Sequence, residues 1–251
     1  MSKTAEAYIP TPAEDLTRRV KNTYSTILAD PPWQFQNRTG KMAPEHKRLL
    51  RYPTMKLDEI KQLPVEKLAS NPAHLYLWCP NALLREGLEV MKAWGFDYKS
   101  NIVWHKVRKD GGSDGRGVGF YFRNVTEMVL FGIKGKLRTL PAGRSQVNYL
   151  STRKREHSRK PDEIFDLIES CSPSPYLELF ARFPRIGWSQ WGNEDVEEND
   201  FNGVALRKGH VEPNLRLIEA PRNYRGDQNR DVDHIASHEL SFEEIAIRRT
   251  P

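Results

Sequence analysis

The sequence predicts an α/β fold in which a mostly parallel sheet is covered by helices on both faces. Three observations predict this class. Short apolar and β-branched runs recur along the chain, and amphipathic helical stretches lie between them. The third is size, because 251 residues with 38% hydrophobic content are enough to build one large core.

Five segments have the composition of strands. Each is a short run of apolar, β-branched or aromatic residues, and several alternate with polar residues as partly buried strands do. They span residues 26–29, 74–79, 101–106, 127–133 and 176–181. Trp78, Trp94 and Trp104 fall within strand or helix patterns and are expected in the core. Because helical stretches separate these runs, the pattern favours parallel pairing over a series of hairpins.

Two amphipathic helices are expected between the strands. The first is capped by Asn81 and ends at Gly95, and the second opens at Pro161, a residue common in the first turn of helices. Their expected inward-facing residues are Leu83, Leu84, Leu88 and Met91 in the first helix, and Ile164, Leu167 and Ile168 in the second. These helices would cover the faces of the sheet.

Changes in composition mark the expected boundaries. Residues 1–23 form an N-terminal extension, residues 24–194 the main domain, and residues 195–251 a highly charged C-terminal extension with little apolar periodicity. Within the main domain, the glycine-rich segment 109–119 and the basic segment 139–160 lack a regular pattern. We therefore expect surface loops at both segments.

The composition predicts a cytoplasmic protein without membrane contact. The apolar runs are too short to cross a bilayer, and the amino terminus lacks the unbroken apolar stretch of a secretory signal. The formal net charge of +6 is compatible with a nucleic-acid partner, although proteins that bind no nucleic acid often carry a similar excess.

No metal site is expected. Cys79 and Cys171 lie outside any metal-ligand spacing, so we expect both thiols to be buried as small hydrophobic groups. His234 and His238 lie four residues apart in the charged tail, and we interpret them as incidental. The chain lacks the HExxH and GxxxxGK[ST] motifs, and its one GxSxG match, residues 111–115, lies in a glycine-rich segment rather than in a turn between an expected strand and helix. Hydrolase and nucleotidase functions are therefore without support.

The segment ILADPPWQF, residues 27–35, contains the first candidate for chemistry. Ligands bind beyond the carboxyl ends of parallel strands, and Asp30 follows the first expected strand directly. Pro31 and Pro32 remove two backbone donors, which leaves carbonyl acceptors beside the carboxylate. Trp33 offers a flat face for stacking on a base, a contact worth roughly 1–3 kcal/mol. The combination is better explained as a binding site for an exocyclic amine on an aromatic ring than as an ordinary proline-rich turn.

Such an amine is a weak nucleophile because its lone pair is delocalised into the ring. Two acceptors that hold its hydrogens would restore lone-pair character at nitrogen and aim it at an electrophilic methyl group. No general base is required before transfer, because the proton can leave afterwards. The corner therefore predicts methyl transfer to an aromatic amine.

Several motifs together resemble the MT-A family of N6-adenine methyltransferases, most closely its small bacterial and phage-type members. They are DPPW, RYPTMKLDEI, LYLWCPNALLREGLEVMKAWGF, NIVWHK, FRNVTEMVLFGIKG, SRKPDEIFDLIE and LELFARFPRIGWSQWGNE. Their order matches the family over residues 24–194, which is thereby identified as a methyltransferase domain. The resemblance implies an S-adenosylmethionine-dependent enzyme on a Rossmann-like sheet. In this permuted arrangement the catalytic DPPW segment precedes the cofactor-binding segment.

The resemblance also implies roles for individual residues. Asp30, Pro31, Pro32 and Trp33 match the catalytic tetrapeptide, in which Asp30 also approaches the ammonium group of the cofactor. Residues that match cofactor contacts are Lys160 at the carboxylate, and Arg182, Asn193 and Glu194 at the ribose and adenine. Glu194 stands where some relatives carry an amide. Residues that match substrate contacts are Tyr52, from a mobile active-site loop in the family, and Glu127.

The expected polymer is DNA rather than RNA. A base must be flipped out or single-stranded to present its amine to the DPPW corner. Basic residues that are candidates for phosphate contacts are Arg116, Arg123, Arg153 and Arg155. Adenine in RNA, the 4-amino group of cytosine, and a non-catalytic nucleic-acid-binding subunit on the same fold stay open as alternatives. A partner subunit or a homodimer is compatible with the sequence.

Overall fold

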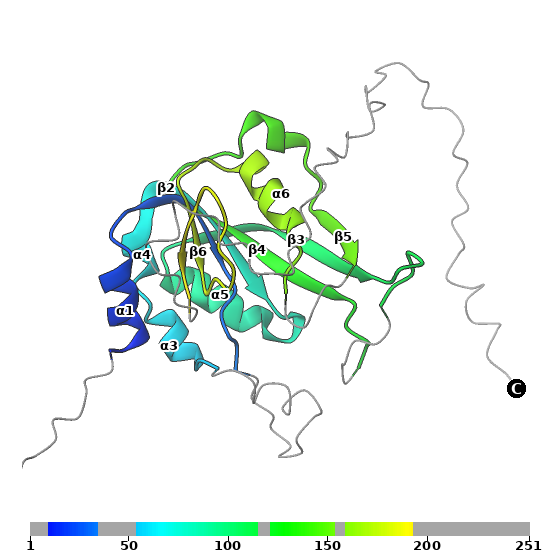
Figure 1. The fold of residues 1–251 in the computed structure, drawn as a ribbon, viewed down its shortest axis with the longest axis horizontal. Helices are drawn as coiled ribbons and strands as arrows, with labels where there is room; N and C mark the ends of the chain where they lie inside the picture. Colours follow the sequence, from blue (N-terminus) through cyan, green and yellow to red (C-terminus); the bar gives the residue numbers. More distant parts are fainter. Residues whose placement is uncertain (1–9, 35–53, 115–120, 154–158, 193–251) are drawn as a thin grey trace, which may run out of the picture. The chain divides into compact units, whose positions relative to one another are not determined.

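The computed structural model describes residues 10–34, 54–114, 121–153 and 159–192 of the chain. These residues form a seven-stranded sheet with the strand order β5-β3-β4-β2-β1-β6-β7 (Figure 1). The strands are β1 (Tyr24–Ala29), β2 (Ala69–Cys79), β3 (Asp97–Val107), β4 (Thr126–Lys134), β5 (Tyr149–Arg153), β6 (Tyr176–Leu179) and β7 (Trp188–Trp191). The helices are α1 (Pro12–Arg19), α3 (Leu57–Lys61), α4 (Val65–Leu68), α5 (Leu84–Ala93) and α6 (Glu163–Cys171). Two 3₁₀ helices span Asn81–Leu83 and Pro141–Ser145.

The sheet is mostly parallel, as the sequence predicts, with one exception. Strand β1 pairs in parallel with β2 and β6, and the β3–β5 and β6–β7 pairs are also parallel. Strand β4 runs antiparallel to both of its neighbours, β2 and β3. Apolar alternation is the same in either direction, so the sequence pattern does not reveal this reversal.

Helices cover both faces of the sheet, which confirms the predicted layers. On one face, α1, α3, α4 and α5 contribute to a cluster of buried residues that includes Leu16, Ile60 and Val90. On the other, Ile164 and Ile168 of α6 pack in a second cluster. Strand β1 supplies both clusters, because successive strand residues point to opposite faces. No helix in the described ranges is long and apolar enough to span a membrane.

Helix α5 differs from its prediction in two ways. The Asn81 side chain does not cap it but donates to the Thr126 carbonyl and hydroxyl oxygens, at 3.1 Å each. Leu84 and Leu88 are 39% and 37% exposed, whereas the small residue Gly87 faces the sheet. A Cβ at Gly87 would lie 2.6 Å from Cys79 Sγ, so the helix lies close to β2 through a position that periodicity alone does not identify. The predicted end at Gly95 is confirmed by its positive φ of 78°.

Other expectations on packing are confirmed, and some elements were not predicted. Cys79 and Cys171 are free and buried, and Trp78, Trp94 and Trp104 lie in the core. The structure adds the short strands β5 and β7 and the helices α1, α3 and α4. Strand β5 lies in the basic segment 139–160, where we expected a loop. Its side chains alternate only between exposed and half-buried, so it gives no apolar signal.

A buried histidine predicts how stability depends on pH. His74 is fully buried on β2, its Nδ1 lies 2.8 Å from the Ser172 hydroxyl, and burial lowers the pKa of its imidazole. In the unfolded chain the His74 imidazole therefore takes up a proton near pH 6.5, whereas in the folded chain it stays neutral to a lower pH. Relative to His74→Gln, we expect the wild type to lose about 1 kcal/mol of its free energy of unfolding as the pH drops from 7 to 5. Urea unfolding of wild type and His74→Gln at both pH values measures this loss, and an equal loss in the variant would contradict it.

Candidate active site

Four charged side chains come together at one edge of the sheet. Asp30 follows the last residue of β1, and Lys106 lies next to the last residue of β3. Because β4 runs in the opposite direction, its second residue, Glu127, reaches this same edge and pairs with Trp104 in the β3–β4 register. Lys160 lies just before α6. Four elements that are distant in the sequence thus supply one cluster.

The four side chains form a chain of alternating charge. Lys160 Nζ lies 3.1 Å from Asp30 Oδ2 and 3.3 Å from Glu127 Oε2. The other Glu127 oxygen pairs with Lys106 Nζ. We call Asp30, Lys160, Glu127 and Lys106 the carboxylate–lysine chain. All four are partly buried, so their pairing is screened less than that of surface charges.

The pairing keeps these groups charged. Burial alone would raise the pKa of Glu127, but Lys160 and Lys106 hold that pKa below its ordinary value. Burial alone would lower the pKa of Lys160, but Asp30 and Glu127 raise it. At neutral pH, Glu127 is therefore a hydrogen-bond acceptor rather than a proton donor, and Lys160 is a fixed cation.

Tryptophans form the floor beneath the two lysines. Lys160 Nζ lies 5.0 Å from the centre of the Trp78 ring, and Lys106 Nζ lies 4.9 Å from that of Trp104. The two rings meet edge to face with centroids 5.7 Å apart. These core residues therefore also stabilise the cations through their π faces.

Backbone hydrogen bonds hold the DPPW corner. The Trp33 N–H donates to the Pro31 carbonyl at 2.8 Å, and the Met55 N–H donates to the Pro32 carbonyl at 2.9 Å. Both predicted acceptors are thus already used once, and each keeps a second lone pair. The Asp30 N–H donates to Leu179 O at 3.4 Å, which ties the corner to β6.

Trp33 is placed differently from its prediction. It is only 6% exposed, and its indole N–H donates to the Trp78 carbonyl at 3.0 Å. This burial disagrees with the prediction that its ring offers an open face to a base. In the structure Trp33 stiffens the corner and anchors it to β2.

The two segments that the resemblance links to the cofactor lie against each other. The Ala181 N–H donates to the Trp191 carbonyl at 3.0 Å. A Cβ on Gly192 would lie 2.0 Å from the Ala181 carbonyl oxygen, so only glycine allows this approach. Phe180 has a φ of 65°, a left-handed conformation that is costly for a residue other than glycine. The turn that leads to Arg182 therefore abuts the strand end that leads to Asn193.

The remaining candidates are not part of the carboxylate–lysine chain. Arg123 lies just before β4 and Arg153 ends β5, and both are exposed. Tyr52, Arg116, Arg155, Asn193 and Glu194 lie outside the described residues. Within the described ranges, no group of three His, Cys, Asp or Glu residues is arranged to hold a metal ion.

Sequence reasoning missed two residues near the site. Lys106 was part of a predicted strand, and only the reversed direction of β4 brings it to Glu127. Glu178 lies on β6, next to Leu28 of β1 in the register, and accepts a 3.1 Å hydrogen bond from Gln190 Nε2. Burial raises the pKa of Glu178 to about 7, and the nearby charge of Asp30 adds to this increase. An acidic residue inside an apolar strand was the available signal.

The raised pKa of Glu178 predicts a second effect of pH. Because this pKa is about 7 rather than 4.5, the contribution of Glu178 to stability is complete below pH 4.5 and is lost as the pH rises to 7. We therefore compare the free energy of unfolding of Glu178→Gln with that of wild type at two pH values. Between pH 5 and pH 8, this difference should shift in favour of the variant by about 1–2 kcal/mol. Unfolding curves at both pH values measure the gain. The exposed Glu66→Gln is the control, and an equal gain in that variant would refute the assignment.

Comparisons with known proteins agree on one family. A sequence model of the MT-A70 family matches residues 24–194. The chain is 32% identical over 190 residues to the Type II methyltransferase M.MunI of a Mycoplasma species, covering 69% of this chain and 78% of that protein.

Longer relatives match as well. A probable N6-adenosine-methyltransferase MT-A70-like protein of Oryza sativa is 31% identical over 187 residues. The N6-adenosine-methyltransferase catalytic subunit METTL3 of Homo sapiens is 28% identical over 178 residues. These alignments cover 73% and 68% of this chain but only 24% and 28% of the relatives, so the chain spans about a quarter of their length. With its α/β sheet and the match over most of its length, the chain belongs to the MT-A70 family.

Proposed function

We propose that this chain transfers a methyl group from S-adenosylmethionine to the exocyclic N6 amine of adenine in DNA. The proposal depends above all on the DPPW corner, where Asp30 lies beside the partly buried ammonium of Lys160. Membership of the MT-A70 family supports it. Relatives in that family are named as a Type II methyltransferase and as N6-adenosine methyltransferases.

The charges of the site fit the methionine end of S-adenosylmethionine, which carries an ammonium and a carboxylate. Asp30 would accept hydrogen bonds from the ammonium, and Lys160 would pair with the carboxylate. Lys160 has a second carboxylate partner in Glu127, so it stays paired when Asp30 turns towards a ligand. Arg182, Asn193 and Glu194 would hold the ribose and adenine. The bound cofactor supplies an electrophilic methyl group.

The acceptors of the corner would prepare the adenine amine. The Asp30 carboxylate and the second lone pair of a proline carbonyl match its two hydrogens. Holding both hydrogens out of the ring plane concentrates the lone pair on nitrogen and orients it. The nitrogen would then be placed to take the methyl group as the bond from that group to sulfur breaks. S-adenosylhomocysteine would be the leaving group, and one amine proton would pass to solvent afterwards.

DNA is the favoured polymer. The alignment covers most of M.MunI but only about a quarter of the N6-adenosine methyltransferases named above. The target base must leave the stack to reach Asp30. Further substrate contacts are proposed at Tyr52 and Glu127 for the base, and at Arg116, Arg123, Arg153 and Arg155 for phosphates.

The test uses the full chain and radiolabelled S-adenosylmethionine. Unmethylated double-stranded DNA, single-stranded DNA and RNA are offered in parallel at equal adenine content, and the products are digested to nucleosides. We expect the label in N6-methyldeoxyadenosine. Label in RNA or on cytosine would show that the substrate is not adenine in DNA. If cofactor binds but no polymer is labelled, the chain is a binding subunit.

A further inference from the structure

Helix α1, which lies in the segment expected as an N-terminal extension, is capped and packed on the domain. The Thr11 N–H donates to Glu14 Oε2 at 2.8 Å, and the Glu14 N–H donates back to Thr11 Oγ1 at 3.3 Å. These two bonds make a capping box, with Pro12 in the first turn. Leu16 is fully buried in the core cluster. The helix is therefore packed on the domain through its own apolar face.

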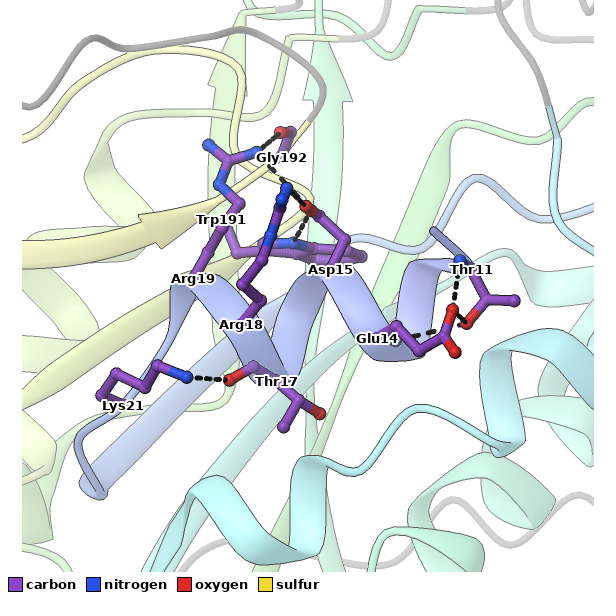
Figure 2. A network of polar contacts seen from close by, with 9 residues as sticks. All are labelled: Thr11, Glu14, Asp15, Thr17, Arg18, Arg19, Lys21, Trp191 and Gly192. Carbon is purple, nitrogen blue, oxygen red and sulfur yellow. Dashed lines mark hydrogen bonds and ion pairs between the residues drawn. The ribbon is translucent and has the colours of Figure 1, made fainter. Parts of the chain in front are cut away.

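Two side chains of α1 contact the end of β7 (Figure 2). The Trp191 indole N–H donates to Asp15 Oδ2 at 2.9 Å, and Arg19 Nη1 donates to the Gly192 carbonyl at 3.5 Å. Arg18 and Arg19 also pair with Asp15, at 3.0 and 3.6 Å. Burial would raise the pKa of Asp15, but these partners hold it below its ordinary value, so the acceptor stays ionised. These contacts join parts of the chain that lie more than 170 residues apart.

Trp191 in turn supports the turn after β6. Its ring meets the Phe180 ring edge to face, with centroids 5.3 Å apart. Its carbonyl accepts the Ala181 N–H. Phe180 is the residue with the left-handed backbone, and such a conformation persists only where its surroundings fix it. Asp15 fixes the Trp191 ring, and the ring fixes this turn.

We propose that Asp15 and Arg19 are positioning residues for the cofactor site. Through Trp191 and the Gly192 carbonyl, they hold the turn before Arg182 and the strand end before Asn193 at the separation that cofactor binding requires. The N-terminal helix is then part of the catalytic unit. This inference rests on the proposed function, in which Arg182 and Asn193 contact S-adenosylmethionine.

The test compares Asp15→Ala with Thr11→Ala. The first removes the acceptor for Trp191, whereas the second weakens α1 at its cap and leaves the contacts to β7 in place. Asp15→Asn restores an oxygen acceptor without the charge. Each full-length variant is studied at a temperature where its thermal unfolding curve shows it folded. The readouts are Kd for S-adenosylmethionine by calorimetry, KM for DNA, and amide hydrogen exchange at Ala181 without cofactor.

We expect Asp15→Ala to raise Kd for S-adenosylmethionine and to speed exchange at Ala181, each by about tenfold. In Asp15→Ala, KM for DNA should change less than about twofold. In Thr11→Ala, Kd for S-adenosylmethionine and exchange at Ala181 should also change less than about twofold. Asp15→Asn should recover part of the affinity that Asp15→Ala loses. The inference is overturned if Asp15→Ala keeps the exchange rate at Ala181 and the Kd of wild type. It is also overturned if Thr11→Ala changes both quantities as much as Asp15→Ala does. If wild type itself fails to bind S-adenosylmethionine, the proposed function fails. The exchange rate at Ala181 then still decides whether Asp15 positions the turn.

Discussion

Replacing Asp30 by asparagine is expected to lower kcat for methyl transfer by about 10³-fold. The variant keeps the shape of the side chain but loses the charge that pairs with Lys160 and accepts hydrogens from an amine. The loss of stability should be small, about 1 kcal/mol, because Asp30 is partly exposed and Lys160 keeps Glu127 as a partner. Single-turnover methyl transfer and thermal unfolding measure the two effects separately.

Asp58→Asn on α3 is the matched control for this change. The Asp58 side chain is 83% exposed, and its Oδ1 lies 3.9 Å from Lys61 Nζ, so this ion pair is exposed and loose. The substitution should leave kcat unchanged. A kcat in Asp30→Asn within about tenfold of wild type would remove Asp30 from the chemistry. A large drop in thermal stability would instead show that Asp30 acts through the fold.

Gly192→Ala is expected to have the largest effect on stability. Its new Cβ would lie 2.0 Å from the Ala181 carbonyl oxygen, which is backbone and cannot rotate away. Strand β7 must then shift from the turn after β6. The cost should be about 3 kcal/mol, or roughly 6–12 °C in Tm, and affinity for S-adenosylmethionine should fall with it.

The control for Gly192→Ala lies in the connection between β6 and β7. Gly187 has a φ of 82°, and a Cβ added there would have no neighbour within 4 Å among the described residues. Gly187→Ala therefore adds only the conformational cost of a left-handed residue, about 1–2 kcal/mol. Thermal unfolding of both variants makes the comparison. If Gly192→Ala is as stable as Gly187→Ala, the close approach of Gly192 to the Ala181 carbonyl is contradicted.

Much of the fold could be predicted from the sequence where apolar periodicity is strong. Strands β1, β2, β4 and β6 and the inward face of α6 are continuous or alternating apolar runs that end in recognisable turns. Strand β7 and helix α1 have few apolar residues of their own. They are held by long-range contacts such as Asp15 with Trp191, and a local pattern does not show such contacts.

Three residues of the candidate site could be predicted singly from the sequence, but their cluster could not. Position after a strand identifies Asp30, and the family motifs add Lys160 and Glu127. Their mutual pairing and the part of Lys106 depend on the direction of β4, which alternation leaves undetermined. The role of Trp33 could not be predicted either, because stacking and burial both call for an aromatic residue at that position.

The most direct measurement is the amount of N6-methyldeoxyadenosine formed when wild type and Asp30→Asn act on unmethylated duplex DNA with labelled S-adenosylmethionine. We expect label in that nucleoside with wild type and almost none with a folded variant that still binds DNA. Equal label from both proteins would contradict the role of the DPPW carboxylate, and label in no adenine product would contradict the proposed reaction.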